Sequence, residues 1–272
     1  MAEMDPYLQQ EKASWEIMSE DETYRKIPSF EDNEFLKLLD REGMLDPGFD
    51  VLDIGCGAAV YSIAMKDRVH SCLGLDFSDR MLENARDLIR RSGAKNIRLL
   101  SGSWEELDLD EMQMRERFDL VFSHTTPAIV DEASVQKLMD ASRRYCAVCL
   151  FARVSQPVAD GIRSLLKLHP EVPQRISRIE EGVPKLFSYL YREGYYPQVH
   201  YEDSPYVFRQ TLQNAIRYYT ADARKIRPLS DAEEARIREY LTELSADGMV
   251  EEAMSPCLVT FYWDKTRRKR FR

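Results

Sequence analysis

Two aspartates and two glycines in the first third of the chain have the spacing of a nucleoside-binding site. Asp53 lies two residues before Gly55 in the apolar run 51–57 (VLDIGCG), and a second apolar run ends in Asp76. Asp76 follows Gly55 by about twenty residues, the distance at which an acid ending a second strand reaches a ribose held over the first turn. The pattern therefore predicts an α/β domain that binds a nucleoside.

The residues around the glycine turn argue against a dinucleotide. A pyrophosphate site favours a third small residue closing G-x-G-x-x-G, but that position holds Val60. Asp53 would repel a pyrophosphate and would suit a positively charged ligand, such as an ammonium or a sulfonium. S-adenosylmethionine carries adenosine, an amino acid and a sulfonium, and no phosphate. It therefore fits this turn better than NAD does.

At these residues the sequence resembles the class I S-adenosylmethionine-dependent methyltransferases. The string VLDIGCGAAVYSIAMKDRVHSCLGLDFSDRMLENAR, residues 51–86, is similar to the first two motifs of that family. The resemblance continues through NIRLLSGSWEEL at 96–107 and FDLVFS at 118–123, and it covers roughly residues 45–152. It implies a methyltransferase (EC 2.1.1.-) that uses S-adenosyl-L-methionine and releases S-adenosyl-L-homocysteine.

The resemblance also implies roles for residues of the first two motifs. The turn of Gly55, Cys56 and Gly57 is expected to contact the methionine moiety, and Asp53 to help hold its ammonium. Asp76 is expected to accept both ribose hydroxyls, a bidentate contact that a carboxylate makes well.

The adenine-binding residues depart from the common family pattern. Many relatives have an acidic residue after the third strand, where this chain has Ser103 and Trp104. We expect both to line the adenine, with Trp104 either covering a ring face or anchoring the loop. Phe77 packs on the adenine or belongs to the core, and Ser123, which ends the fourth strand, completes the predicted cofactor-binding residues.

His124 is the candidate catalytic residue, because the end of the fourth strand faces the transferring methyl group in this family. With an ordinary pKa near 6.5, it could take a proton from the acceptor, or it could hydrogen-bond the ligand or a neighbouring helix. A base is optional, because holding donor and acceptor at attack distance supplies much of the catalysis. Trp15 and Tyr24 are candidate lid residues over the donor. The four scattered histidines predict no metal site.

Strand–helix alternation predicts a Rossmann-like, doubly wound α/β fold. We expect a mostly parallel seven-stranded sheet with an antiparallel last strand, plus a helical lid. The predicted strands are 50–55, 70–76, 96–100, 118–123, 145–152, 198–202 and 257–263. The predicted helices are 59–67, 79–92, 131–143, 158–169, 184–194, 206–220 and 230–246. The predicted parts are an N-terminal helical segment of the lid (1–48), the cofactor-binding core (49–152), helical insertions and the sixth strand forming the substrate lid (153–256), and the last strand with a basic tail (257–272).

The charge, the apolar content and the cysteines of the chain indicate which partners and which location are expected. A net charge of −9 and a pI of about 5.2 disfavour a nucleic-acid partner, because binding to a phosphate backbone depends on clustered Lys and Arg. The exception is the tail 265–272, an RNA anchor or a solvated terminus. The polar N-terminus and the absence of a long apolar run predict a cytoplasmic location without a membrane partner. The five cysteines predict reduced thiols, with Cys146 and Cys149 on opposite faces of one strand.

The sequence therefore predicts a methyltransferase acting on a small molecule at O, N or S by in-line transfer. An RNA base methyltransferase and a non-catalytic S-adenosylmethionine-binding sensor or partner subunit are the alternatives. The acceptor and the oligomeric state stay open.

Overall fold

The computed structural model describes residues 6–129, 131–168 and 182–268. The chain divides into two compact units, and each is described by itself. The sheet unit comprises residues 25–153, 174–202 and 257–272, and the helical unit comprises residues 1–24, 154–173 and 203–256.

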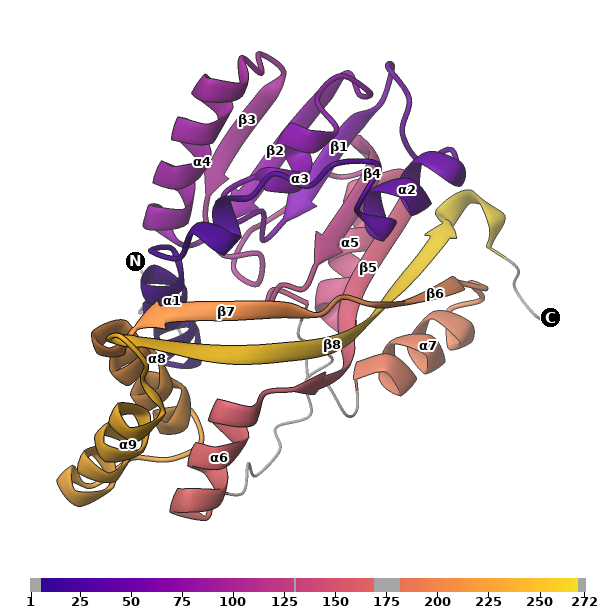
Figure 1. The fold of residues 1–272 in the computed structure, drawn as a ribbon. Coiled ribbons are helices and arrows are strands. Elements are labelled where there is room, and N and C mark those ends of the chain that lie inside the picture. Colours follow the sequence, from indigo (N-terminus) through magenta and orange to yellow (C-terminus); the bar gives the residue numbers. More distant parts are fainter. Residues whose placement is uncertain (1–5, 130, 169–181, 269–272) are drawn as a thin grey trace. The chain divides into compact units, whose positions relative to one another are not determined.

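The sheet follows the order β3-β2-β1-β4-β5-β8-β6, with β7 paired to β8 (Figure 1). Strands β1, β2, β3, β4 and β5 pair in parallel. The strand bounds are β1 Asp50–Ile54, β2 Ser71–Asp76, β3 Ile97–Ser101, β4 Phe118–His124, β5 Ser142–Ser155, β6 Gln198–Asp203, β7 Tyr206–Thr211 and β8 Met249–Asp264. The predicted fold class is confirmed.

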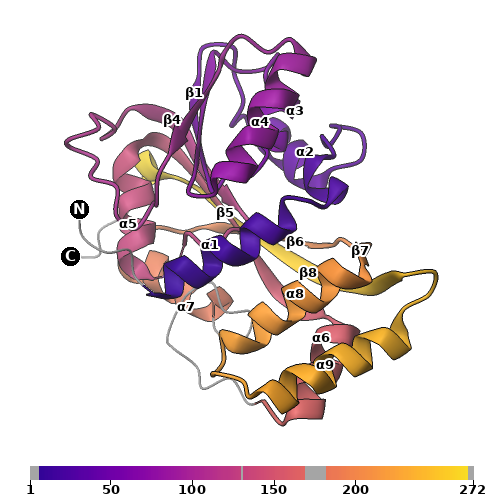
Figure 2. The same cartoon turned by 90° about the vertical axis from the view of Figure 1, so that its left-hand side faces the viewer.

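Helices cover both faces of the sheet unit. In Figure 2, α2, α3 and α4 lie on one side of β1 and β4, and α5 lies on the other. The helix bounds are α2 Glu34–Arg41, α3 Val60–Ala64, α4 Asp79–Ser92, α5 Glu132–Ala141 and α7 Gly182–Arg192, with the 3-10 helix η2 at Lys265–Arg267. Because side chains alternate along a strand, Leu52 and Ile54 of β1 pack in the cluster of α5, whereas Val51 packs in the cluster of α2.

Capping residues define where these helices begin. Ser78 accepts the N–H of Met81 at the start of α4, and Gly93 ends that helix in the left-handed region with φ +68°. Asn33 caps α2 and Asp131 caps α5 in the same way. Such caps satisfy backbone groups that a helix leaves unpaired at its ends. The start of α4 is therefore held directly after Asp76.

The helical unit contains four helices among its described residues, together with β7 and the first part of β8. The helices are α1 Pro6–Met18, α6 Pro157–Leu166, α8 Leu212–Arg224 and α9 Asp231–Leu244, and the 3-10 helix η1 spans Glu22–Arg25. Buried Glu252 of β8 accepts the N–H groups of Val158 and Ala159, both at 3.0 Å, and the hydroxyl of Tyr219 at 2.7 Å. This carboxylate joins the start of α6 to α8.

The prediction of a helix over 206–220 is wrong for its first six residues. Residues 206–211 form β7, which pairs antiparallel with Met249–Met254 of β8. Phe208 and Gln210 are buried while Val207 and Arg209 are exposed, a period of two that defines a strand. Strand β8 also begins at Met249 and not at 257. The sheet consequently has eight strands, not seven.

The two units do not follow the predicted lid boundaries. Residues 25–48 and the described part of 174–202 belong to the sheet unit, although the sequence placed them in the lid. The assignment of the helical unit as a substrate lid stays a prediction. In the part of the chain that the structure describes, no helix is long and apolar enough to cross a membrane.

Candidate functional site

The parallel register brings the ends of neighbouring strands together at one edge of the sheet. Ile54 of β1 pairs with Leu75 of β2 and with Ser123 of β4, and Asp76 pairs with Ser101 of β3. The segments that follow these strands therefore start side by side. This edge is where open α/β sheets bind ligands.

Asp76 ties the glycine turn to the start of α4. Its buried carboxylate accepts the N–H of Gly57 at 2.8 Å and the N–H of Ser78 at 2.9 Å. The N–H groups of Gly55 and Cys56 both donate to the carbonyl of Leu75, at 2.8 and 3.0 Å. Asp76 therefore fixes the glycine turn against the start of α4, and its contact with the ribose hydroxyls stays a prediction.

The two glycines of the turn differ in what surrounds them. Both have positive φ, +69° at Gly55 and +52° at Gly57. A Cβ on Gly55 would lie 2.0 Å from Oγ1 of Thr126, so the turn packs against the segment after β4. A Cβ on Gly57 would meet only Sδ of Met81, at 3.9 Å, among the described atoms. The Gly57 side of the turn is therefore the side that leaves room for a ligand.

Asp53 is a buried carboxylate facing α3. Its Oδ2 accepts the hydroxyl of Ser62 at 2.7 Å. Burial raises the pKa of Asp53 to about 7, against the lowering effect of the Ser62 hydrogen bond and with a further contribution from the Asp76 charge. A positive charge beside Asp53 would favour its ionised form. The site is thus poised to gain from a cationic ligand.

Cys56 belongs to the turn through its backbone, because its side chain is packed. The thiol lies against Gly74, where an added Cβ would come within 2.8 Å of Sγ. Burial raises the pKa of this thiol well above its ordinary range. Phe77, next to Asp76, is half-buried. A role for either side chain in binding the donor stays a prediction.

The loop after β3 carries Ser103 and Trp104. Trp104 is buried in the core cluster on the α5 face, and its Nε1 donates to the carbonyl of Ser134 at 3.2 Å. These contacts are those of a loop anchor, one of the two roles considered for Trp104. The N–H of Gly102 donates to the carbonyl of Asp76 at 2.9 Å, so the loop starts beside the predicted ribose acid. Adenine contacts by Ser103 and Trp104 stay predictions.

The end of β4 places a buried hydroxyl next to a neutral imidazole. Ser123 is buried, and its Oγ has no hydrogen-bond partner within the described ranges. In His124, Nε2 lies 3.0 Å from the hydroxyl of Tyr61 and Nδ1 lies 3.2 Å from Oγ1 of Thr125. Burial lowers the pKa of His124 to about 3, so the ring is neutral at pH 7.

Thr125 follows with φ +49°, a region that β-branched residues seldom enter. Strained backbone of this kind is concentrated at functional sites. With both ring nitrogens of His124 engaged and its charged form disfavoured, a role as general base stays a prediction.

Trp15 and Tyr24 lie in the helical unit and contact each other. Their rings meet edge to face with centroids 5.7 Å apart, and Tyr24 meets Phe208 at 6.4 Å. Burial raises the pKa of the Tyr24 hydroxyl well above its ordinary value. Closure of these residues over the donor stays a prediction.

The sequence prediction missed residues from α2, α3 and the segment after β4. Tyr61 and Ser62 contact His124 and Asp53, Asn33 Nδ2 donates to the Tyr61 hydroxyl at 3.3 Å, and Thr126 packs on Gly55. Ser62 could have been found from its place in the first turn of the helix after the glycines. Across the described parts of the chain, no group of three or more His, Cys, Asp or Glu is arranged to hold a metal ion.

The order of the parallel strands and the helices on both faces define a Rossmann-like α/β fold. Comparisons with known proteins narrow the class of protein. A family model described as "Methyltransferase domain" matches residues 45–175. The uncharacterized methyltransferase YcgJ of Bacillus subtilis is 29% identical over 124 residues, 43% of this chain and 47% of that protein. The demethylmenaquinone methyltransferase of Geobacillus stearothermophilus is 28% identical over 122 residues, 43% of this chain and 50% of that protein. The chain therefore spans about half the length of these relatives.

Solved structures share the fold. The crystal structure of a candidate methyltransferase from Bacillus halodurans aligns with a TM-score of 0.50 at 14% identity, over 86% of this chain and 99% of that chain. These findings confirm the resemblance seen in the sequence. The family model and the relatives support a class I S-adenosylmethionine-dependent methyltransferase, with the matched methyltransferase domain at residues 45–175.

Proposed function

We propose that the protein binds S-adenosylmethionine at the carboxyl edge of β1, β2 and β4 and transfers its methyl group to a small molecule. The observation that carries this proposal is the convergence of Asp53, Gly57 and Asp76, because it combines a ribose acceptor, an open glycine turn and a buried acid within the methyltransferase domain. The orphan hydroxyl of Ser123 supports it further, since a bound ligand would give this buried group a partner.

The residues present fit this donor, and each would have a distinct task. S-adenosylmethionine, when bound, supplies a methyl group on a sulfonium that a nucleophile displaces. Asp76 would hold the ribose, the turn at Gly57 would lie along the amino-acid half, and Asp53 would balance its positive charge. His124, neutral and hydrogen-bonded on both sides, would orient Thr125 and the end of β4. Catalysis would then come mainly from positioning.

A small acceptor is favoured over a nucleic acid. The demethylmenaquinone methyltransferases among the relatives act, by their names, on a quinone, which is a small molecule. Two described cations of the basic tail form ion pairs with acidic residues of the protein itself. Lys265 pairs with Glu116 at 3.2 Å, and Arg268 pairs with Glu193 at 2.9 Å. The remaining tail residues, 269–272, lie outside the described residues.

The test is turnover. Purified protein and S-adenosylmethionine are incubated with a panel of acceptors, namely demethylated quinols, catechols, small amines, thiols and bulk RNA, and S-adenosylhomocysteine release is measured. We expect release with a small acceptor, and its loss in Asp76→Ala. Release with RNA alone would replace the proposed acceptor class. Donor binding without release for any acceptor would leave a sensor or partner subunit as the function.

A further inference from the structure

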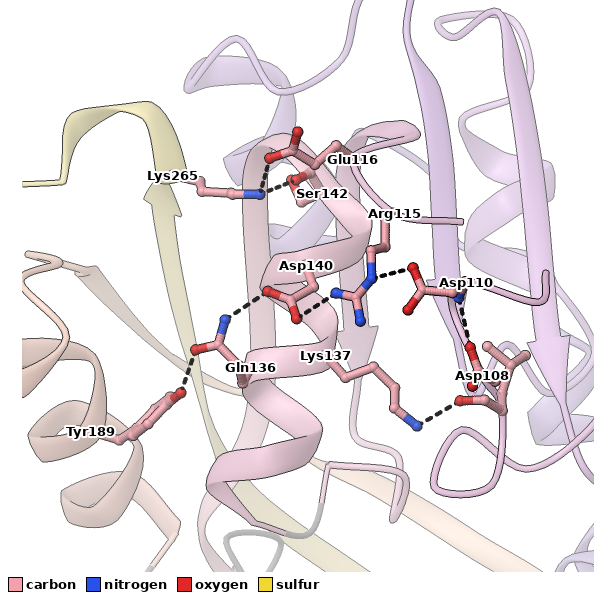
Figure 3. A network of polar contacts seen from close by, with 11 residues as sticks. Asp108, Asp110, Arg115, Glu116, Gln136, Lys137, Asp140, Ser142, Tyr189 and Lys265 are labelled. Carbon is pink, nitrogen blue, oxygen red and sulfur yellow. Dashed lines mark hydrogen bonds and ion pairs between the residues drawn. The ribbon is translucent and has the colours of Figure 1, made fainter. Parts of the chain in front are cut away.

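The loop after β3 is held in place by a single lysine of α5. Lys137 reaches from the helix toward the loop (Figure 3) and donates to three backbone carbonyls, those of Trp104 at 2.9 Å, Glu105 at 3.0 Å and Leu107 at 2.7 Å. An ammonium has three N–H donors. Lys137 therefore spends its whole hydrogen-bonding capacity on one short stretch of loop backbone.

Trp104 makes a second connection between the same two elements. Its indole N–H donates to the carbonyl of Ser134, one helical turn before Lys137, and the Lys137 ammonium lies 5.5 Å from the centroid of its ring. We call Trp104, Ser134 and Lys137 the loop clamp. Because the clamp combines a charged donor, an indole donor and a buried ring, it leaves residues 104–107 little freedom to move relative to α5.

The clamp acts on a segment that starts at the predicted ribose acid. Ser101 is the register partner of Asp76, and the N–H of Gly102 donates to the carbonyl of Asp76. The carbonyl of Ser103 accepts the N–H of Leu107 at 3.0 Å, which closes the loop into a turn. Ser103 thus lies between two fixed points, β2 on one side and the clamp on the other.

The three hydrogen bonds of Lys137 are partly shielded from water. The pKa of Lys137 is lowered by burial, an effect that nearby Asp108 and Glu105 oppose. An apolar side chain in its place would leave three partly buried carbonyls without the Lys137 ammonium as a donor, which favours a rearrangement of the loop backbone toward water. The backbone of 104–107 would be expected to turn outward, carrying Ser103 with it.

We propose that Lys137 is a positioning residue for the nucleoside half of the donor, holding residues 101–107 so that Ser103 meets the adenine. Lys137 acts through the loop, and all three of its hydrogen bonds go to loop carbonyls. The inference rests on the proposed function, because it requires S-adenosylmethionine to bind at this edge.

The chain offers a matched control on the same loop and helix. Arg115, at the far end of the loop, bonds to Asp110 at 2.6 Å and to Asp140 of α5 at 3.0 Å (Figure 3). It also joins the loop to α5 through a cation, but it is half-exposed and its ion-pair partners Asp110 and Asp140 both lie outside 101–107. Arg115→Gln therefore removes a comparable connection without releasing the segment next to Asp76.

The test is calorimetric titration with S-adenosylhomocysteine and with 5′-methylthioadenosine, which has the nucleoside but no amino acid, at a temperature where every variant is folded. We expect Lys137→Met to raise both dissociation constants at least tenfold and by similar factors. Arg115→Gln should stay within twofold of wild type, and Lys137→Arg, which keeps the charged donors, should recover most of the loss.

Three other results would overturn either the role of Lys137 or the proposed function. Lys137→Met with a lower unfolding temperature but unchanged dissociation constants would make the clamp merely structural and overturn the inference. Loss of S-adenosylhomocysteine binding with unchanged methylthioadenosine binding would also overturn it. Wild type that binds neither ligand would overturn the proposed function. If Lys137→Met does not fold, Lys137→Gln is measured instead, with the same expected losses.

Discussion

Asp53 and Asp76 are neighbouring acids with opposite surroundings. Asp76 accepts two backbone N–H groups, which stabilise its charge, whereas Asp53 has one hydroxyl partner and is otherwise buried. The raised pKa of Asp53, about 7, follows from that difference. Its protonation state near neutral pH should therefore depend on whether a cation lies beside it.

Donor affinity should consequently rise with pH. A cationic amino-acid group binds best to ionised Asp53, and a carboxyl with a pKa of about 7 goes from about one-tenth to nine-tenths ionised between pH 6 and 8. We expect S-adenosylhomocysteine to bind wild type about tenfold more tightly at pH 8 than at pH 6, measured by calorimetry. Asp53→Asn is the control, because position 53 cannot titrate in this variant and any pH dependence that remains comes from other groups, such as those of the ligand. Equal pH dependence in both proteins would contradict the assignment.

Asp53 also makes the stability of the folded protein depend on pH. The unfolded chain releases the Asp53 proton near its ordinary pKa of 3.8, while the folded protein keeps it to about 7. The free energy of unfolding therefore falls as pH rises from about 4 to 7 and then levels off, as far as Asp53 contributes. Asp53→Asn should remove this part of the pH dependence.

His124 should remain neutral through the physiological range. Its pKa, lowered by burial to about 3, predicts one imidazole NMR resonance that keeps its neutral position from pH 8 to pH 5 and disappears in His124→Gln. Because the unfolded chain takes up a proton below about 6.5, this group lowers stability as pH falls through that value. A titration midpoint near 6.5 for that resonance would contradict the structure and restore the general base.

Among the elements, the turn between β1 and α3 requires a glycine at position 55 for two reasons. Gly55→Ala combines a left-handed φ of +69° with a Cβ 2.0 Å from Thr126 Oγ1. Gly43 has nearly the same φ, +67°, and nothing within 4 Å, so Gly43→Ala isolates the backbone cost. We expect a loss of unfolding free energy of about 1 kcal/mol for Gly43→Ala and about 3 kcal/mol for Gly55→Ala. Equal losses would mean that the turn does not pack on Thr126.

Elements with a clear local pattern could be predicted from the sequence. Strands β1, β2 and β4 are apolar runs with polar residues at their ends, and Ser78 and Gly93 mark the limits of α4 as capping residues do. Cys146 and Cys149 lie in the two opposite core clusters, as the strand period required.

The remaining features depend on contacts between distant segments. Strand β7 has only six residues and runs directly into α8, so its period of two was hidden beside a strong helical pattern. The burial of Trp104, the carbonyl partners of Lys137 and the contact of Tyr61 with His124 each depend on which helix meets which loop. Local propensity does not contain that information, because tertiary packing decides it.

At the scale of the whole molecule, the residues proposed to bind or position the donor belong to the sheet unit. Asp53, Gly57, Asp76, Ser123 and Lys137 all fall within residues 25–153. The helical unit has its own hydrophobic core, formed by buried residues of α6, α8 and α9. The proposed donor-binding residues therefore fall in one unit, and a role of the helical unit in acceptor choice stays a prediction.

The most direct test of the account is thermal unfolding with S-adenosylmethionine, S-adenosylhomocysteine or NAD, on wild type and Asp76→Ala. A ligand at about a hundred times its dissociation constant stabilises the folded state by roughly 2.7 kcal/mol, a shift of several degrees. We predict that both sulfur nucleosides shift wild type, that NAD does not, and that Asp76→Ala loses the shift. Stabilisation by NAD alone, or by none of the three, would contradict the assignment of this edge as an S-adenosylmethionine site.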